Sequence, residues 1–216
     1  MIPRILEPEV MDSAEEARDY DSMDHREVNE RFAADFLQAA AGLKPAARVL
    51  DVGTGTALIP IEIASRSPDM RITAIDLAEE MLNLGRRNVA RAGCDDRIDL
   101  RRVDAKDLAG EDAAFDAVVS NSIIHHIPEP LAVFREMKRV CREGGLLFVR
   151  DLLRPESTER LEELVALHAA GTNGHQRKLF SDSLHAALTL NEVADLLDKT
   201  GLPRGAVEQT SDRHWT

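Results

Sequence analysis

The stretch 49–57 carries the residues whose types and spacing point most directly to chemistry. An apolar run ends in Asp51, and Gly53 and Gly55 follow it in the pattern Asp-x-Gly-x-Gly-x-Ala. Glycine tolerates dihedral angles that other residues avoid, and it places no side chain between the backbone and a ligand. The pattern therefore predicts a buried strand that runs into a tight turn and then a helix, with the turn close to a bound ligand.

Two classes of ligand suit such a turn, dinucleotides and S-adenosyl-L-methionine (SAM). The dinucleotide fingerprint is G-x-G-x-x-G, in which the third glycine packs the helix against the strand. Leu58 occupies that third position here. An acid at Asp51 would repel a pyrophosphate but could help to hold an ammonium group. The pattern therefore favours a ligand with an amino-acid end and an adenosine end.

The apolar runs that follow the turn also end in residues that could bind a ligand. Asp76 comes 21 residues after Gly55 and closes the run 72–75, where an acid can accept hydrogen bonds from ribose hydroxyls. Later runs at 98–103, 115–121 and 145–150 lead into stretches that include Asp104, Ala105, Asn121, His125, His126, Arg150 and Asp151. In open α/β sheets ligands bind at the carboxyl ends of the strands, so these stretches are expected to share one edge.

Five elements in this order resemble the class I SAM-dependent methyltransferases, of the bacterial, small-molecule type. The resemblance is close over residues 45–155 and looser elsewhere. It implies an α/β fold that is Rossmann-like and doubly wound, with a mostly parallel sheet, helices on both faces and a small helical cap. One departure is Ala57, where many members have a third glycine. Because alanine is small, cofactor binding is still expected.

The resemblance implies that SAM contacts come from the turn and the strand ends. Asp51 is expected to face the amino group, Thr54 and Thr56 the carboxylate, and Asp76 the ribose. The implied cofactor-binding residues are Asp51, Gly53, Thr54, Gly55, Thr56, Asp76, Leu77, Met81, Asp104, Ala105 and Asn121. Strand-end capping is the alternative for the three aspartates, and core packing is the alternative for Met81. No metal is expected, because a sulfonium is already activated.

Three histidines are candidate catalytic groups if the acceptor must lose a proton, since the unperturbed pKa of histidine is about 6.5. They are His125 and His126, in the loop after the fourth apolar run, and His175. The alternatives are that the first two only shape the loop and that His175 is solvated.

Candidate substrate-binding residues come from four segments and are Tyr20, His25, Asn29, Arg150, Asp151, Arg177 and Arg213. An internal Arg150–Asp151 ion pair and a solvated Arg177 are the alternatives. The arginines, together with Arg154, suggest an acceptor with an anionic or hydrogen-bonding group, because arginine forks suit carboxylates.

The composition sets limits on the partners. The chain has 216 residues, a net charge of −12, two cysteines without metal-ligand spacing, and no long basic run. These features predict one domain with a sizeable core and argue against non-specific nucleic-acid binding. The N-terminus lacks a secretion signal and no apolar run approaches the ~20 residues that span a bilayer. We expect a cytoplasmic monomer or homodimer that acts without a nucleic acid or a membrane.

The periodicity predicts an N-terminal arm and cap helix over 1–44 and a methyltransferase domain over 45–216, with a helical insertion at about 153–188. Strands and helices alternate, which predicts six parallel strands in the order 3-2-1-4-5-6, the last at about 206–210. Because few residues follow Gln209, no antiparallel strand is expected. Thr189 and Glu192 fit a capping box at the start of a helix.

The leading hypothesis is methyl transfer from SAM to a small-molecule acceptor by direct displacement. Three alternatives remain open. They are an RNA or protein methyltransferase, a module that binds SAM without chemistry, and a nicotinamide oxidoreductase. The first lacks a basic patch and an Asn-Pro-Pro-Tyr-type motif after the fourth strand, and Leu58 and Asp51 disfavour the last.

Overall fold

The structure is a computed structural model that describes residues 2–8, 15, 17–18, 21, 26–108, 110 and 112–216. Tyr20 and His25, two predicted substrate-binding residues, lie outside the described residues. The chain divides into two compact units. The sheet unit comprises Val10–Asn121 and Arg135–Val149, and the helical unit comprises Met1–Glu9, Ser122–Phe134 and Arg150–Thr216.

The sheet unit is built on parallel strands. They are β1 (Arg48–Val52), β2 (Arg71–Asp76), β3 (Ile98–Arg102), β4 (Phe115–Asn121) and the first part of β5 (Cys141–Leu152). β1 pairs in parallel with β2 and β4, and β2 pairs in parallel with β3. β1 and β4 are almost wholly buried, as expected for strands of a parallel sheet that is covered on both faces.

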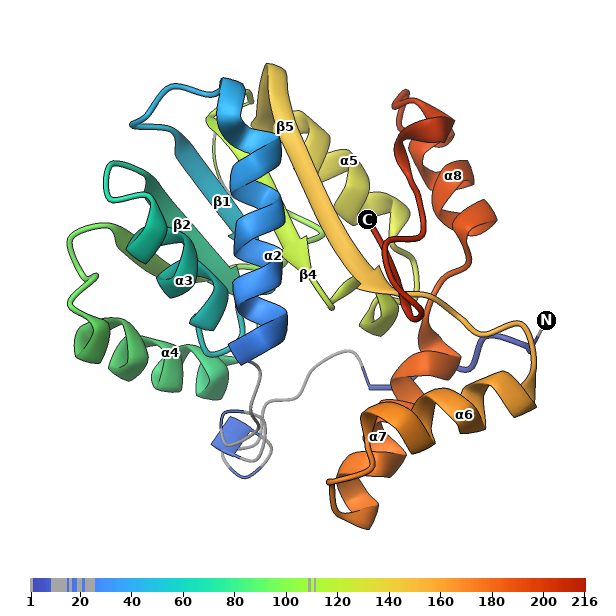
Figure 1. Cartoon of the computed structure of the whole chain (residues 1–216). Helices are drawn as coiled ribbons and strands as arrows, with labels where there is room; N and C mark the ends of the chain where they lie inside the picture. The colour runs from blue at the N-terminus through green and yellow to red at the C-terminus, as the bar shows by residue number, and fades with distance from the viewer. Residues whose placement is uncertain are drawn as a thin grey trace. The chain divides into compact units, whose positions relative to one another are not determined.

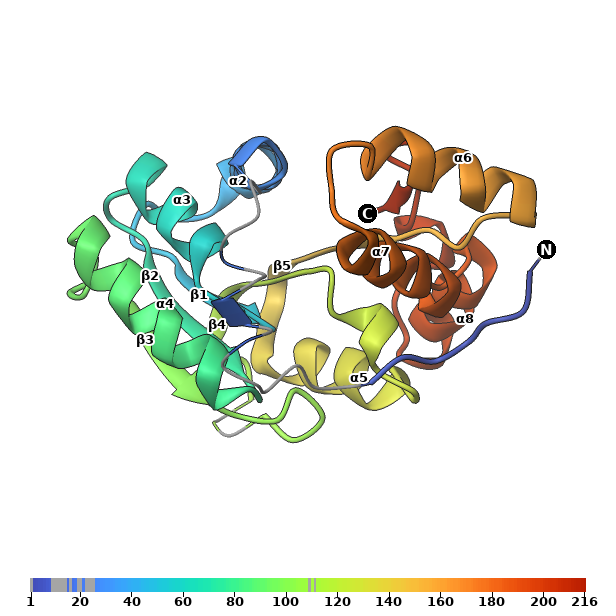
Figure 2. The same ribbon diagram turned by 90° about the horizontal axis from the view of Figure 1, so that it is seen from below.

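Helices cover both faces of this sheet. They are α2 (Arg26–Ala39) with the short η1 (Ala40–Gly42), α3 (Leu58–Arg66), α4 (Glu79–Ala92) and α5 (Leu131–Val140). α2 and α3 lie on one face and the second part of α5 on the other (Figures 1 and 2). The Rossmann-like, doubly wound α/β fold is therefore confirmed.

The predicted cap helix α2 packs on the sheet. Phe32 and Phe36 are fully buried in the core of the sheet unit, and their rings lie 5.2 and 5.9 Å from the ring of Phe148. Residues 2–8, in contrast, belong to the helical unit. The domain division at residue 44 and the insertion at 153–188 stay predictions.

The helical unit contains α6 (Thr158–His168), α7 (Gly174–Ala186), α8 (Leu190–Lys199), the short η2 (Ile124–His126) and η3 (Arg204–Ala206), and β6 (His214–Trp215). Leu152, Leu161, Leu164, Leu184 and Ala187 form its apolar core. No helix in the described part of the chain is long and apolar enough to cross a membrane.

The strand order β3-β2-β1-β4-β5-β6 confirms the predicted order of the first five strands. The prediction of six parallel strands is wrong, and the sixth strand is His214–Trp215 rather than 206–210. β6 pairs antiparallel with Asp151 and Leu152 at the end of β5. Trp215 also bridges antiparallel to Gln209, where the backbones of Glu208 and Thr210 hydrogen-bond to Thr216 and His214. The chain can turn back because Ser211 Oγ accepts hydrogen bonds from the backbone of Arg213 and His214. This turn allows the single tryptophan to be buried.

Candidate functional site

The turn after β1 adopts the left-handed backbone conformation that its glycines suggested. Gly53 and Gly55 have φ values of 76° and 54°, and Ala57 has a φ of 63°. Left-handed backbone costs an alanine roughly 1–2 kcal/mol. The Cβ of Ala57 fits tightly, because Gly85 of α4 approaches so closely that a Cβ there would lie 3.4 Å from it. The chain therefore keeps a turn of the glycine type with an alanine in its third position.

Asp76 at the end of β2 organises this turn. Its Oδ2 accepts a hydrogen bond from the Gly55 N–H at 2.8 Å, and its Oδ1 accepts one from the Ala78 N–H at 2.9 Å. The N–H groups of Gly53 and Thr54 donate to the carbonyl of Ile75 in the same strand. The carboxylate predicted to bind the ribose therefore also joins the turn to the start of α4.

Asn88 is a second residue that positions the turn, and it was not predicted from the sequence. Its Nδ2 donates to the Thr56 carbonyl at 3.0 Å and to Asp21 at 2.9 Å. Asn88 stands in the buried stripe of α4 among Met81, Leu82, Gly85 and Val89. A polar residue within a buried apolar stripe was the available signal.

Four polar side-chain atoms at this edge are buried without a hydrogen-bond partner in the described structure. They are Asp51 Oδ2, Thr54 Oγ1, Thr56 Oγ1 and Asn121 Oδ1. Asp51 lies opposite Val119 in the parallel β1–β4 pair, and β4 ends at Asn121, so all four belong to the carboxyl edge of the sheet unit. A buried polar group without a partner is costly. The arrangement therefore points to a polar ligand that supplies the missing partners.

Burial raises the pKa of Asp51 to about 7. The nearby Thr54 side chain opposes this shift, and the negative charge of Asp76 adds to it. A carboxyl group in this state gains most from a positively charged partner, because the partner stabilises its ionised form.

The remaining predicted cofactor residues lie nearby in the sheet unit, and their roles stay predictions. Asp104 Oδ1 accepts from the Lys106 N–H at 2.9 Å in the loop after β3. Leu77 and Ala105 are half-buried, whereas Met81 is buried and packs with Ala78 and Ala17.

A cluster of histidines and carboxylates occupies the helical unit. We call Glu7, His125, His126 and Asp151 the His125 cluster. His125 Nδ1 lies 2.5 Å from Asp151 Oδ1, and the Ile124 N–H donates to Asp151 Oδ2 at 2.5 Å. Glu7 Oε1 lies 3.4 Å from His125 Nε2 and 3.3 Å from His126 Nδ1.

Glu7 is brought to this cluster by the N-terminal segment 2–8, whose role the sequence analysis missed. The Arg4 guanidinium donates to the carbonyls of His125, Ile127, Pro128 and Ala186. The Ile5 N–H donates to the His185 carbonyl at 3.1 Å. These contacts fasten the segment to η2 and α7, which no local sequence pattern could have indicated.

The charges of the His125 cluster are strongly coupled. Burial alone would lower the pKa of His125, but Asp151 and Glu7 outweigh it and raise the pKa. Burial and the neighbouring His125 lower the pKa of His126 to about 4. Burial raises the pKa of Glu7, whereas His125 keeps the pKa of Asp151 low despite its burial.

The other predicted catalytic and substrate-binding residues are dispersed. His175 and Arg177 are exposed on the first turn of α7, and Asn29 is half-buried on α2. Arg150 donates to Thr216 Oγ1, and Arg213 pairs with Asp212. Arg154, named only in the arginine hypothesis, pairs with Glu192. No described contact shows any of these groups facing an acceptor, and their roles stay predictions.

Comparisons with known proteins decide the family. Residues 49–145 match a family described as a methyltransferase domain. The chain is 34% identical over 170 residues to a ubiquinone biosynthesis O-methyltransferase of Xanthomonas axonopodis pv. citri, covering 76% of this chain and 69% of the relative. The chain belongs to the class I SAM-dependent methyltransferases. It is therefore an enzyme whose cofactor is SAM, as the turn and strand ends predicted.

Other relatives of this methyltransferase differ in their acceptors. A phosphatidylethanolamine N-methyltransferase of Cereibacter sphaeroides is 41% identical over 98 residues, covering 45% of this chain and 47% of the relative. Among solved structures, a SAM-dependent methyltransferase from Aquifex aeolicus has a TM-score of 0.69 at 20% identity, covering 95% of this chain and 96% of that one. At this identity the likeness concerns the fold.

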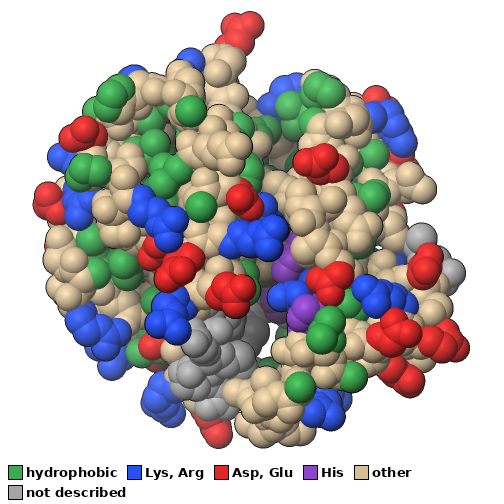
Figure 3. All heavy atoms as spheres, viewed as in Figure 1, with side chains coloured by type: hydrophobic (Ala, Val, Ile, Leu, Met, Phe, Trp, Pro, Cys, Tyr) green, Lys and Arg blue, Asp and Glu red, His purple; other side chains and the backbone are tan. Residues whose placement is uncertain are grey.

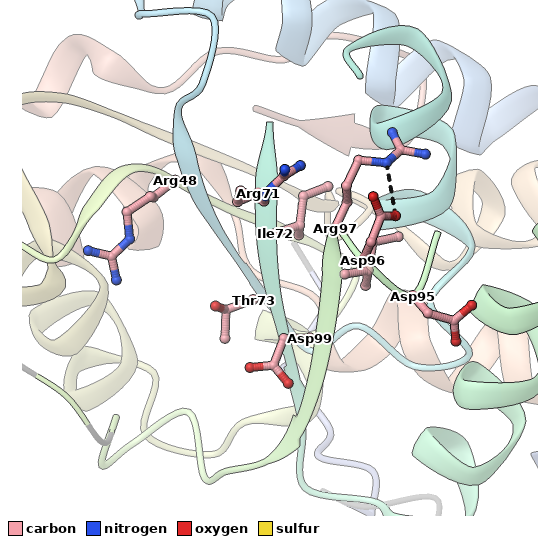
Figure 4. A pocket seen from close by; sticks show the side chains of 9 residues that line it. Arg48, Arg71, Ile72, Thr73, Asp95, Asp96, Arg97 and Asp99 are labelled. Carbon is pink, nitrogen blue, oxygen red and sulfur yellow. Dashed lines mark ion pairs between the residues drawn. The ribbon is translucent and has the colours of Figure 1, made fainter. Parts of the chain in front are cut away.

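A pocket in the sheet unit of the methyltransferase lies at the opposite edge (Figure 4). It is lined by Arg48 and Arg71, the first residues of β1 and β2, and by residues 95–99 before and within β3. Arg97 pairs there with Asp96 at 3.5 Å. Because the glycine turn follows the carboxyl end of β1, this mixed-charge pocket is not the candidate cofactor site.

Proposed function

We propose that this methyltransferase transfers the methyl group of SAM to a small-molecule acceptor, and that the turn after β1 holds the cofactor. The observation that carries the proposal is the set of buried, unpartnered atoms on Asp51, Thr54, Thr56 and Asn121. A ligand with both an ammonium and a carboxylate group supplies the donors and acceptors that this edge lacks.

Each of these side chains has a definite task in the proposal. Asp51 pairs in its ionised form with the ammonium group. The hydroxyls of Thr54 and Thr56 donate to the carboxylate, aided by the N-terminus of α3, whose N–H groups and dipole favour an anion. Asp76 accepts from the ribose hydroxyls while it keeps the Gly55 N–H in place.

Methyl transfer depends mainly on how the protein positions SAM and the acceptor. Bound SAM supplies an activated methyl group, and its transfer is a displacement in which the nucleophile, the methyl carbon and the sulfur align. Side chains that fix this line and exclude water contribute most of the rate. A base is needed only for an acceptor that carries a proton at neutral pH, and His125, His126 and His175 stay the candidates for that role.

A small acceptor is favoured over a nucleic acid. The net charge is −12, and Lys and Arg side chains are interspersed with Asp and Glu on the face shown in Figure 3. One relative is named as an O-methyltransferase of ubiquinone biosynthesis and another as a phosphatidylethanolamine N-methyltransferase. Because the first resemblance spans more of the chain, hydroxylated precursors of ubiquinone are the first acceptors to assay.

Calorimetric titration with SAM, S-adenosylhomocysteine and NAD tests cofactor choice. We expect SAM and S-adenosylhomocysteine to bind with one site per chain and NAD not to bind. Tighter binding of NAD would contradict the proposal. Radiolabelled methyl transfer to phenolic and amine acceptors then tests turnover. If no small acceptor is methylated and RNA or protein is labelled instead, the enzyme is an RNA or protein methyltransferase.

A matched pair of threonine variants tests the assigned atoms. Thr56→Val removes a hydroxyl without a described partner, whereas Thr200→Val removes one that donates to the carbonyls of Leu196 and Leu197. We expect Thr56→Val to weaken SAM binding and leave the unliganded protein as stable or more stable. Thr200→Val is expected to leave SAM affinity unchanged and to lower the stability of the unliganded protein. Equal SAM affinity in both variants would remove Thr56 from the cofactor site.

A further inference from the structure

Three side chains of the His125 cluster present ligand atoms toward one another. Glu7, His125 and His126 each offer a carboxylate oxygen or a ring nitrogen, and these atoms all lie within 4.8 Å of one another. The Glu7 and His125 side chains are only 8% and 4% exposed. The cofactor turn of the sheet unit uses none of these residues, so the cluster requires an explanation of its own.

The second observation concerns the carboxylate of Glu7. Its Oε1 is buried and has no hydrogen-bond partner in the described structure, although two imidazole nitrogens lie 3.3 and 3.4 Å away. Zinc binds nitrogen and oxygen ligands at about 2.0–2.2 Å, and a tetrahedral arrangement then separates the ligand atoms by about 3.3–3.6 Å. The two separations that involve Glu7 match those of atoms around a shared ion, and the two histidine nitrogens lie within 4.8 Å of each other.

Asp151 prepares His125 for such a role. It holds Nδ1 of the ring at 2.5 Å, which leaves Nε2 directed at Glu7. Histidines that bind metals usually donate their other ring N–H to a carboxylate in this way. Asp151 is itself fixed, because the N–H groups of Ile124 and Leu152 donate to it.

We propose that Glu7, His125 and His126 bind a divalent transition-metal ion of the zinc type. With the ion bound, His125 and His126 cannot also act as the base for an acceptor that carries a proton. Two imidazoles and one carboxylate suit zinc, whereas magnesium and calcium favour oxygen ligands alone. Three protein ligands leave a fourth position for water or another ligand. His126 Nδ1 also lies 3.3 Å from the Pro8 carbonyl, so this nitrogen exchanges that contact for the ion.

The site joins segments that are distant in the sequence. Glu7 comes from the N-terminal segment, and the two histidines come from η2. Arg4 already fastens the segment through backbone carbonyls. A bound ion would hold the N-terminal segment to η2 more strongly than these hydrogen bonds do, and it would stabilise the helical unit. This proposal does not rest on methyl transfer, because metal binding can be measured without a methyl acceptor or SAM.

The test uses the full chain without an affinity tag, freed of metal by a chelator. Calorimetric titration with Zn²⁺ and absorption spectroscopy with Co²⁺ are expected to show one ion per chain and the intense visible bands of tetrahedral cobalt. Glu7→Gln and His126→Gln each replace one ligand of the proposed site with a side chain of similar size. We expect each to weaken Zn²⁺ binding at least tenfold.

His185→Gln is the matched control, because His185 lies on α7 of the same unit and bonds to the Ser181 carbonyl. It is expected to bind Zn²⁺ like the unaltered protein. Circular dichroism checks that all three variants fold. The absence of stoichiometric binding, or equal affinity in Glu7→Gln, His126→Gln and His185→Gln, would overturn the proposal. Neither outcome would bear on SAM binding, which is titrated separately.

Discussion

At the scale of single residues, Asp51 connects ligand binding with stability. Its carboxyl group is 2% exposed and has a pKa of about 7, so the folded protein holds its proton far more tightly than the unfolded chain does. A raised acid pKa makes the folded state lose stability as the pH rises from about 4 to about 7. A bound cation would stabilise the ionised form of the same group.

Asp51→Asn separates these two effects. The variant lacks the titrating group, so without ligand it should be more stable than the unaltered protein at pH 8, by up to about 4 kcal/mol at 1.36 kcal/mol per pKa unit. The difference should vanish near pH 4. Urea unfolding at both pH values measures it. An unchanged difference between pH 4 and pH 8 would show that Asp51 does not titrate in this range.

A variant of Asp76 tests whether this residue binds the ribose of SAM. Asp76→Ala removes the proposed acceptor for the ribose and also the acceptor of the Gly55 and Ala78 N–H groups. Charge-assisted hydrogen bonds are worth roughly 1.5–3 kcal/mol, so SAM affinity should fall about tenfold or more. Calorimetry compares it with Asp69→Ala, an exposed acid in the loop before β2. Equal affinities would remove Asp76 from the site.

At the scale of elements, two helices of the helical unit begin with complete capping boxes. Thr189 and Glu192 exchange hydrogen bonds at the start of α8, as predicted, and Asn173 and Gln176 do so at the start of α7. Thr189 is buried and its partner Glu192 also pairs with Arg154, whereas Asn173 and its surroundings are exposed. The two capping boxes should therefore contribute unequally to the stability of the folded protein.

Thr189→Ala should cost about 1 kcal/mol or more of unfolding free energy, and Asn173→Ala about half as much, because cap losses range over roughly 0.5–2 kcal/mol. Urea unfolding followed by circular dichroism measures both. Thr189→Ser keeps the cap hydroxyl and should retain most of the stability. A larger loss in Asn173→Ala than in Thr189→Ala would contradict the role given to burial.

Local patterns predicted the elements better than they predicted the contacts between them. The helix start at Thr189 and the strand before Gly53 follow from short-range rules. β6 was missed because its formation depends on pairing with β5, which is distant in sequence.

The candidate site divides in the same way. The residues of the turn could be read from their spacing, since they lie within a few positions of one another. Asn88 could be noticed as a polar residue in an apolar stripe, but its partner and that of Glu7 could not be predicted, because they stand 32 and 118 positions away, at Thr56 and His125. Long-range partners of this kind leave no periodic signal in a single sequence.

At the scale of the whole molecule, charge and ligand are complementary. A chain with a net charge of −12 attracts a cationic ligand over a distance. SAM carries a sulfonium and an ammonium group, so the negative net charge of the chain and the buried acid at Asp51 favour the same ligand. Binding, ionisation of Asp51 and stability are then linked properties of one protein, and a single titration can measure their coupling.

Binding of SAM at pH 6 should release about one proton per chain. Asp51, with a pKa of about 7, is then mostly protonated in the free protein and must ionise to pair with the ammonium group. The amino group of the ligand is already charged, because α-amino groups titrate at about 7.7–8.0. Calorimetry in buffers of different ionisation enthalpy counts the proton. Asp51→Asn should release none, and release should fall toward zero at pH 8. Equal release from both proteins at pH 6 would show that Asp51 does not face the ammonium group, and the assignment of the turn would have to be redrawn.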